Sequence, residues 1–169
     1  YHFPVAALND GKAAALAELA TGHLKGVTNG AALVLGSGLG GGIIINGKLF
    51  QGSHFQAGEL TFLLPLQMEK LDPSLMQETT LSAIGLITKV NEILASLDLK
   101  DGLLAFKAIN AKKEAVYPIF ETYCRNLAIT ILNLQTIFDM ETFVLGGGIS
   151  AQSILIEEVN RQFDKVHHE

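Results

Sequence analysis

The sequence predicts an α/β fold in which a mixed sheet containing a β-meander is flanked by long helices. Hydrophobic residues make up 49% of the 169 residues and charged residues only 17%, which indicates a chain that folds around a sizeable core. Short apolar segments bounded by glycines predict strands, and longer segments with apolar residues at helical spacing predict helices. A chain of this length suffices for one ordinary domain and is too short for two large ones.

A strand, a turn and a helix are expected at the N-terminus. Residues 3–8 are apolar and end at Asn9-Asp10-Gly11, and the Ala-rich residues 12–24 that follow favour a helix. Asp10 would then lie between a strand end and a helix N-terminus. There it can cap the helix or act as a general base, and the local pattern leaves both interpretations open.

A β-meander is expected next. Residues 31–35 are typical of a buried strand, residues 36–42 of a glycine-rich turn and residues 43–45 of a second strand, while Asn46-Gly47 predicts a tight turn into residues 49–51. The glycine-rich turn contains G-x-G-x-x-G, but a strand follows it instead of the helix that a dinucleotide site requires. We therefore interpret it as a phosphate-binding turn built from backbone N–H groups and a serine hydroxyl, against the alternative of a simple hairpin.

Three helices and a strand are expected in the rest of the chain. Apolar residues recur at helical spacing over residues 74–97 and 116–138, and residues 142–145 are typical of a short strand. An amphipathic helix is predicted over residues 153–166. The intervening Gly146-Gly147-Gly148 joins strand to helix, so it can contact a nucleotide through bare backbone or simply connect the two elements.

Charge and cysteine content argue against several classes of protein. The 12 Lys and Arg residues are scattered among 17 Asp and Glu residues, for a net charge of -5, so we expect no nucleic-acid contact through this domain. The longest uncharged stretch, residues 26–47, contains eight glycines, which argues against a membrane span. The single Cys124 fits a cytoplasmic protein and is expected to be an inert core residue.

Four segments carry, in this order, the motifs of a known family. They are Asn9-Asp10 with its Ala-rich helix, residues 35–49, residues 51–59 ending in Ala57-Gly58-Glu59, and residues 144–150. This set resembles the ROK family (repressors, open reading frames, sugar kinases), whose members have the actin-like ATPase, or ribonuclease H-like, fold. The resemblance spans nearly all of residues 1–169, yet it covers only the C-terminal half of the usual family protein. It implies the C-terminal lobe of a two-lobed sugar kinase, with the N-terminal ATP-binding lobe outside this chain.

The resemblance also implies roles for particular residues. Asp10 matches the base that takes a proton from a sugar hydroxyl, and Asn9 matches the neighbour that hydrogen-bonds the sugar. Glu59 matches the acidic residue of the Glu-x-Gly-His sugar motif, and Glu78 lies where the family carries another sugar-binding glutamate. The implied nucleotide-binding positions are Ser37, Gly38 and Gly40 for a phosphate motif and Gly146, Gly147 and Gly148 for the adenosine-contacting turn.

The activity implied by the resemblance is ATP-dependent phosphorylation of a hexose, with Mg²⁺ and backbone donors absorbing charge on the transferred phosphate. A homodimer is a further implication, and the chain without its other lobe is expected to be inactive. The alternative is the sugar-sensing domain of a ROK-type transcriptional regulator. The retained Asp10 and the two glycine turns favour the kinase, because a sensor needs neither a base nor a phosphate-binding turn.

The sequence departs from the family at the sugar motif. Thr61 and Phe62 stand where the motif has Gly-His, which removes a histidine that contacts the sugar and binds zinc in many members. The three-cysteine zinc loop of the family is absent as well, so we expect no structural zinc. These departures leave open which sugar is used.

Overall fold

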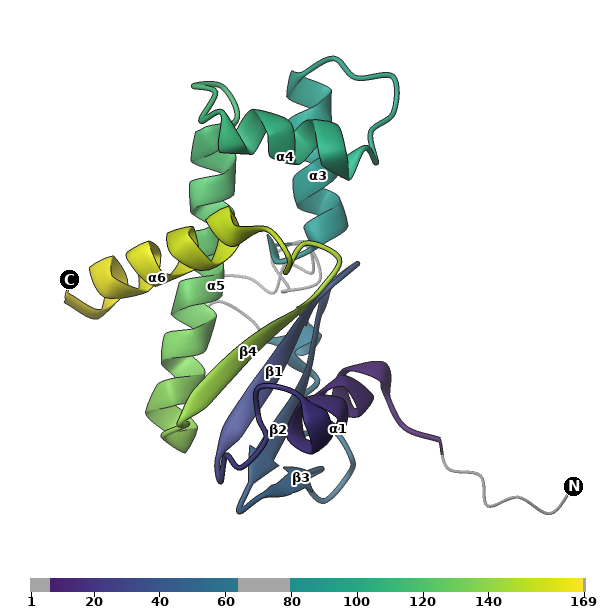
Figure 1. Ribbon diagram of the computed structural model, residues 1–169, viewed down its shortest axis with the longest axis vertical. Coiled ribbons are helices and arrows are strands. Elements are labelled where there is room, and N and C mark those ends of the chain that lie inside the picture. The colour runs from purple at the N-terminus through teal and green to yellow at the C-terminus, as the bar shows by residue number, and fades with distance from the viewer. Residues whose placement is uncertain (1–6, 64–79, 169) are drawn as a thin grey trace, which may run out of the picture.

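The computed structural model describes residues 7–63 and 80–168 (Figure 1). Within these ranges four strands form one mixed sheet in the order β3-β2-β1-β4. Strand β1 pairs antiparallel with β2 and parallel with β4, and β2 pairs antiparallel with β3. The strands are β1 (Gly30–Leu35), β2 (Leu39–Ile45), β3 (Lys48–Phe50) and β4 (Thr142–Gly147). The predicted β-meander is therefore confirmed.

The glycine-rich segment is divided differently from the prediction. Strand β2 begins at Leu39, so residues 40–42 lie in the strand and only residues 36–38 form the turn. A Cβ atom on Gly42 would lie 2.5 Å from the Cβ of Ala15 in helix α1 (Asp10–Thr21), and one on Gly11 would lie 2.6 Å from the backbone nitrogen of Gly41. The strand glycines thus allow a helix to rest directly on strand backbone.

Helix α1 begins two residues earlier than predicted because its cap is Asn9, and it ends at Thr21, three residues earlier than predicted. The Oδ1 atom of Asn9 accepts hydrogen bonds from the backbone N–H groups of Gly11 at 2.9 Å and Lys12 at 3.3 Å, which satisfies two of the free donors at the helix start. Asp10 is the first helical residue. Most of the strand predicted over residues 3–8 lies outside the described residues, and residues 7–9 are not in a strand.

The helix predicted over residues 74–97 is wrong as one continuous element. Residues 81–82 are not helical, and α3 (Ala83–Ile93) begins after Ser82, whose Oγ accepts a hydrogen bond from the backbone N–H of Gly85 at 2.9 Å. The helix ends before Ala95, which has a φ of 52°. Helix α4 (Gly102–Asn110) was not predicted, although Asp101 caps it.

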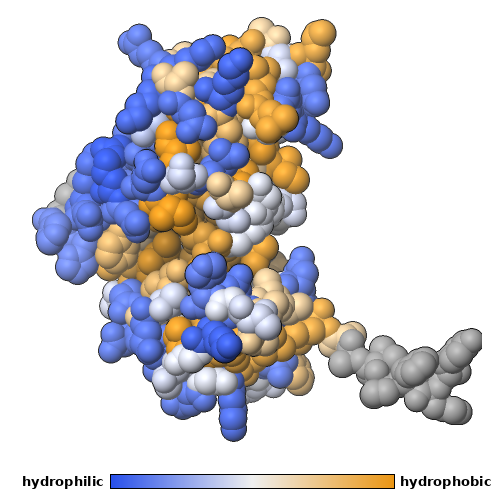
Figure 2. Space-filling view, viewed as in Figure 1, coloured by the Kyte–Doolittle hydropathy of each residue, from blue (hydrophilic) through white to orange (hydrophobic). Residues whose placement is uncertain are grey.

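The last two helices agree with the predictions. Helix α5 (Tyr117–Phe138) and helix α6 (Ser153–His168) follow the predicted ranges closely. The inner face of α6 buries Ile154, Leu155 and Val159, and Figure 2 shows hydrophilic residues gathered over the outer side of this helix. This arrangement is that of an amphipathic helix on a sheet domain.

Helices cover both faces of the sheet (Figure 1). On one face Ala32 of β1 packs with Ala15 of α1, and on the other Leu33 of β1 belongs to the main core with Leu127 of α5. Helices α3 and α4 pack against each other and against α5 beyond the end of the sheet, so α3 does not cover the sheet as expected. Cys124 is fully buried in the main core. No helix within the described ranges is long and apolar enough to cross a membrane.

Candidate active site

The two glycine turns meet at one end of the sheet. Strands β1 and β4 run parallel, with Val34 opposite Gly146 and Leu35 opposite Gly147. The segments that follow them, residues 36–38 and Gly148 onward, therefore leave the sheet side by side at its carboxyl edge. This edge is where open α/β sheets hold their ligands. Gly146 and Gly147 are the last residues of β4, so the turn itself begins at Gly148, two residues later than predicted.

Backbone geometry accounts for the glycines of the second turn. Gly147 has a φ of 100°, and a Cβ atom there would lie 2.2 Å from the carbonyl oxygen of Leu35. Ser150 then folds back, and its N–H and Oγ donate to the Gly147 carbonyl at 3.1 and 2.9 Å. Only glycine combines this φ with so close an approach to β1.

Open space borders both turns. A Cβ atom added to Gly36 or to Gly148 would have no heavy atom within 4 Å, and Ser37 is exposed. The carbonyl of Gly36 accepts the N–H of Ala83 at 2.9 Å, which anchors the first turn to the start of α3. The two turns thus present fixed, uncovered backbone, and this arrangement fits the phosphates and sugar of a nucleotide.

The start of α1 lies beside the same end of the sheet. Gly11 contacts the backbone of Gly41, which pairs with Leu33 of β1 close to the first turn. Asp10 precedes this contact, is exposed, and accepts a hydrogen bond on Oδ1 from the N–H of Gly11 at 2.8 Å. The carboxylate is therefore held at a helix N-terminus, where negative charge is favoured.

The segment after β3 brings Glu59 next to the start of α1. Gly58, with a φ of 86°, packs on β2, where an added Cβ would lie 3.1 Å from the carbonyl oxygen of Gly41. The next residue is Glu59, whose Oε1 atom accepts a hydrogen bond from Nζ of Lys12 at 3.1 Å. The same ammonium group donates to the carbonyl oxygen of Phe55. The side chain of Lys12 is 4% exposed and that of Glu59 is 29% exposed.

Lys12 is a residue of this site that sequence reasoning missed. The available signal was a single lysine among the alanines of a helix start, just after Asp10. A lysine in such a position is usually a solvated surface residue. Its partner lies 47 residues away along the chain, so only the tertiary structure reveals the pair.

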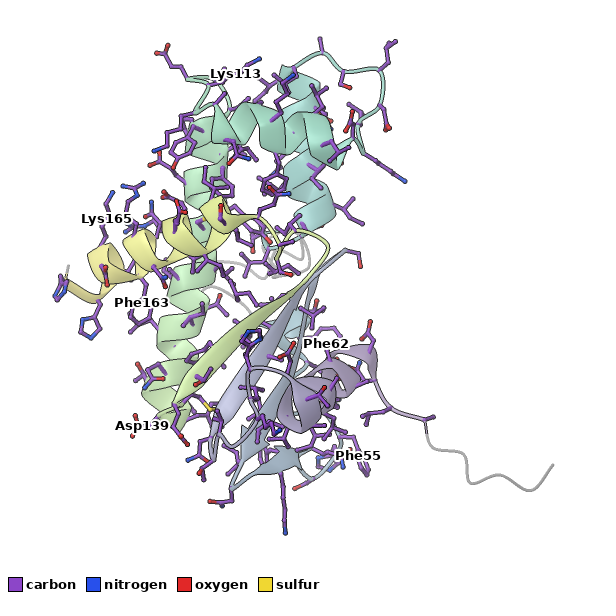
Figure 3. All side chains as sticks on the ribbon, viewed as in Figure 1. Phe55, Phe62, Lys113, Asp139, Phe163 and Lys165 are labelled. Atoms are coloured by element: carbon purple, nitrogen blue, oxygen red, sulfur yellow. The ribbon has the colours of Figure 1, made fainter. Side chains whose placement is uncertain are left out.

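Other predicted positions lie apart from this arrangement or outside the described residues. Glu78 lies outside the described residues. Phe62, at the position of the motif histidine, follows Glu59 in a short 3-10 helix (Leu60–Phe62) and is 65% exposed. Phe55, which is 67% exposed, and Phe62 are both labelled in Figure 3. Within residues 7–63 and 80–168 no group of three or more His, Cys, Asp or Glu residues could hold a metal ion.

A second polar cluster lies between α5 and α6. Glu158 is 3% exposed and accepts hydrogen bonds from Tyr117 at 2.9 Å, from Gln162 at 2.6 Å and from Nε of Arg161 at 2.9 Å. Burial alone would raise the pKa of Glu158, but the hydrogen bonds from Arg161, Gln162 and Tyr117 outweigh it and lower the pKa. Burial and the bond to Glu158 raise the pKa of Tyr117 to about 12. Arg161 also pairs with Glu121.

Comparison with known proteins decides the family. The family model described as "ROK family" matches residues 1–168. The chain belongs to the ROK family. The glucokinase of Halalkalibacterium halodurans is 30% identical over 95% of this chain and 54% of its own length. A beta-glucoside kinase of Klebsiella pneumoniae is 30% identical over 86% of this chain and 50% of its own. This ROK chain thus spans about half the length of the curated relatives it matches.

Solved structures confirm the predicted fold class. A ROK family glucokinase from Streptomyces griseus, solved in complex with glucose and AMPPNP, superposes with a TM-score of 0.80 at 25% identity and covers 96% of this chain and 58% of that chain. A ROK family transcriptional regulator superposes with a TM-score of 0.76 at 25% identity and covers 93% of this chain and 43% of that one. The domain therefore has the actin-like ATPase fold of its family.

Proposed function

We propose that this chain is the C-terminal lobe of an ATP-dependent sugar kinase that phosphorylates a hexose. One observation supports the proposal, and it joins segments that lie far apart in the sequence. The two glycine turns leave the sheet side by side at the carboxyl ends of β1 and β4, and the residues next to Asp10 and Glu59 pack on Gly41 of the adjacent strand β2. A carboxylate base beside bare backbone donors is what transfer of a phosphoryl group to a hydroxyl requires.

Asp10 is the general base in this proposal. Its exposed carboxylate takes the proton of the sugar hydroxyl, and the bond from Gly11 N–H to Oδ1 fixes its orientation. Asn9 has a double role. Its Oδ1 atom is used in capping α1, so its amide NH₂ group is the part left to donate to the sugar. Glu59 accepts a hydrogen bond from another sugar hydroxyl. Glu78, which lies outside the described residues, has the same role in this proposal.

The glycine turns form this lobe's half of the nucleotide site. Ser37, Gly38 and the adjoining Gly40 hold phosphate oxygens, and the backbone at residues 146–148 packs against the adenosine. ATP together with a divalent cation such as Mg²⁺ supplies the activated phosphoryl group when bound. The remaining contacts come from an N-terminal lobe, and a homodimer of the complete protein is part of the same proposal.

The relatives suggest which sugars to test. They include a glucokinase, beta-glucoside kinases and an N-acetyl-D-glucosamine kinase of Vibrio cholerae, at about 30% identity. The substitution of Phe62 for the motif histidine alters the sugar side of the site. A panel of glucose, mannose, N-acetylglucosamine, N-acetylmannosamine and cellobiose covers the chemical range of these enzymes.

The test is ATP-dependent phosphorylation of this panel by the complete protein and by its Asp10→Asn variant. The asparagine keeps the oxygen that accepts Gly11 N–H, so the variant should fold and bind sugar, while kcat falls roughly 100-fold or more. Asp164→Asn, on the exposed face of α6, is the matched control and should retain activity. Sugar binding without turnover in the wild-type protein would support a sugar sensor instead, and full activity in Asp10→Asn would refute the role of Asp10.

A further inference from the structure

A buried lysine lies within the proposed sugar site. Lys12 is 3% exposed, yet it belongs to the first turn of α1, two positions after the exposed Asp10. Its ammonium group is bonded to Oε1 of Glu59 and to the carbonyl oxygen of Phe55. A lysine is rarely buried to this degree without a partner, because removing its charge from water is costly. The pair is therefore a specific feature of this chain's interior.

The backbone around the pair is fixed on both sides. Gly11 holds the start of α1 against β2, and Gly58 holds the segment before Glu59 against the same strand. Strand β3 pairs with β2 at Ile43, Ile44 and Ile45, so residues 40–42 have no strand neighbour on that side within the described residues. Beside these residues, Lys12 connects helix α1 to the segment that contains Phe55 and Glu59. The glycines set the approach of the two backbones, and the lysine sets the direction of the carboxylate.

The two partners differ in their exposure to solvent. The lysine side chain is 4% exposed and the glutamate side chain 29%. The Glu59 carboxylate is thus bonded to a buried lysine and remains partly accessible to a ligand. A lysine suits this task because its three N–H donors can point to a carboxylate and to a carbonyl in different directions.

We propose that Lys12 is a positioning residue for sugar recognition: its ammonium group orients the Glu59 carboxylate so that the free part of that carboxylate receives sugar hydroxyls beside Asp10. This inference rests on the proposed function. It assigns a sugar-binding contribution to a residue that itself does not reach the sugar. The simpler alternative is a salt bridge that contributes only to stability, and the two alternatives predict different kinetics.

The first experiment separates sugar binding from stability. In the complete protein, Lys12→Met should raise the KM and Kd for the preferred sugar of the panel about tenfold or more, the usual effect of a lost charged hydrogen bond. The KM for ATP should stay within about twofold, since none of the residues bonded to Lys12 belongs to the glycine turns. Arg161→Met is the matched control, because it breaks another ion pair with one buried member, at the α5–α6 interface. It should lower thermal stability and leave the sugar KM unchanged.

The second experiment tests whether Lys12 acts through Glu59. Glu59→Gln should weaken sugar binding, and adding Lys12→Met to that variant should weaken it less than about twofold further. If the two substitutions multiply as independent effects, or if Lys12→Met lowers stability without changing the sugar KM, the inference is overturned.

Three further outcomes are informative. If Lys12→Met does not fold, Lys12→Gln keeps a donor in the same position without the charge, and it should raise the sugar KM about threefold or more; a wild-type value would overturn the inference. Sugar binding without phosphorylation by the wild-type protein would refute the proposed kinase activity alone. The inference about Lys12 would still be tested by comparing the sugar Kd of the wild type and the variant. Absence of any sugar binding would overturn both proposals.

Discussion

Gly147 shows how strongly a single residue of the site is constrained. Its φ of 100° and the 2.2 Å separation between an added Cβ and the Leu35 carbonyl oxygen leave no room for a side chain. The neighbouring Gly148 has open space at the same position. Two adjacent glycines of one motif thus have different reasons to be glycine: the first is required by the fold, and the second leaves room for a ligand.

This difference gives a prediction for two alanine variants. Gly147→Ala should lower the free energy of unfolding by about 3 kcal/mol, because backbone strain and steric overlap with β1 act together. Gly148→Ala should change it by less than about 0.5 kcal/mol. Chemical denaturation of the two variants and the wild type measures both values. Equal stability of the two variants would contradict the description of this turn.

Asn9 and Asp10 illustrate what a short motif leaves undecided. The pattern left open whether Asp10 caps the helix or acts as a general base. In the structure Asn9 caps α1 through its Oδ1 atom, whereas Asp10 bonds to the next N–H and remains exposed. A general base must reach its substrate. The exposure of Asp10, with the capping of α1 left to Asn9, is therefore compatible with the proposed role of Asp10.

At the scale of elements, the glycines of β2 are the clearest case of a tertiary cause. The sequence suggested that all the glycines from residue 36 to residue 42 belong to one ligand-binding turn. Gly41 and Gly42 lie in the strand instead, where they permit contact with the segment around Gly58 and with α1. Close packing of a helix on strand backbone is not encoded in any local periodicity, since it depends on which helix lies above the strand.

The contact between α5 and α6 provides a pH-dependent prediction. Hydrogen bonds lower the pKa of Glu158 below its ordinary value of 4.5, so Glu158 contributes stability above that pH and loses it as the pH falls through the lowered pKa. Below about pH 4.5 the unfolded chain binds a proton that the folded chain does not, and the unfolding free energy then rises with pH.

The measurement compares unfolding free energies of the wild type and Glu158→Gln between pH 3 and pH 7. The wild type should lose more stability than the variant as the pH falls below about 4.5. The difference in slope of unfolding free energy against pH should correspond to the uptake of at most one proton on unfolding. Identical pH dependence of the two proteins would show that Glu158 keeps an ordinary pKa in the folded state.

At the scale of the whole molecule, Cys124 reports on the integrity of the core. It is fully buried among residues from the sheet and the helices, and burial raises the pKa of its thiol. Both effects suppress reaction, because the thiolate is the nucleophile and the reagent needs access. The sequence suggested an inert core cysteine, and its burial in the structure confirms its place in the core.

The expected outcome is that Cys124 reacts with a disulfide reagent such as DTNB only when the domain unfolds. Mass spectrometry of the peptide around residue 124 should give a labelling rate equal to the unfolding rate measured by circular dichroism under the same conditions. Labelling much faster than unfolding would reveal local opening of α5. The denatured protein, labelled at once, serves as the control.

The sequence by itself determined the family, the α/β class, the β-meander, α5, α6 and the two glycine turns, because hydrophobic periodicity, turn residues and motif spacing are local properties. The tertiary structure decided the break before α3 and the strand role of the β2 glycines. It likewise decided the side-by-side exit of the two turns from the sheet, and the packing of the segments next to Asp10 and Glu59 on β2. It also decided the buried pair of Lys12 and Glu59. Each of these depends on contacts between residues distant in sequence, and the free energies of such contacts are set by packing and desolvation, which no local pattern records.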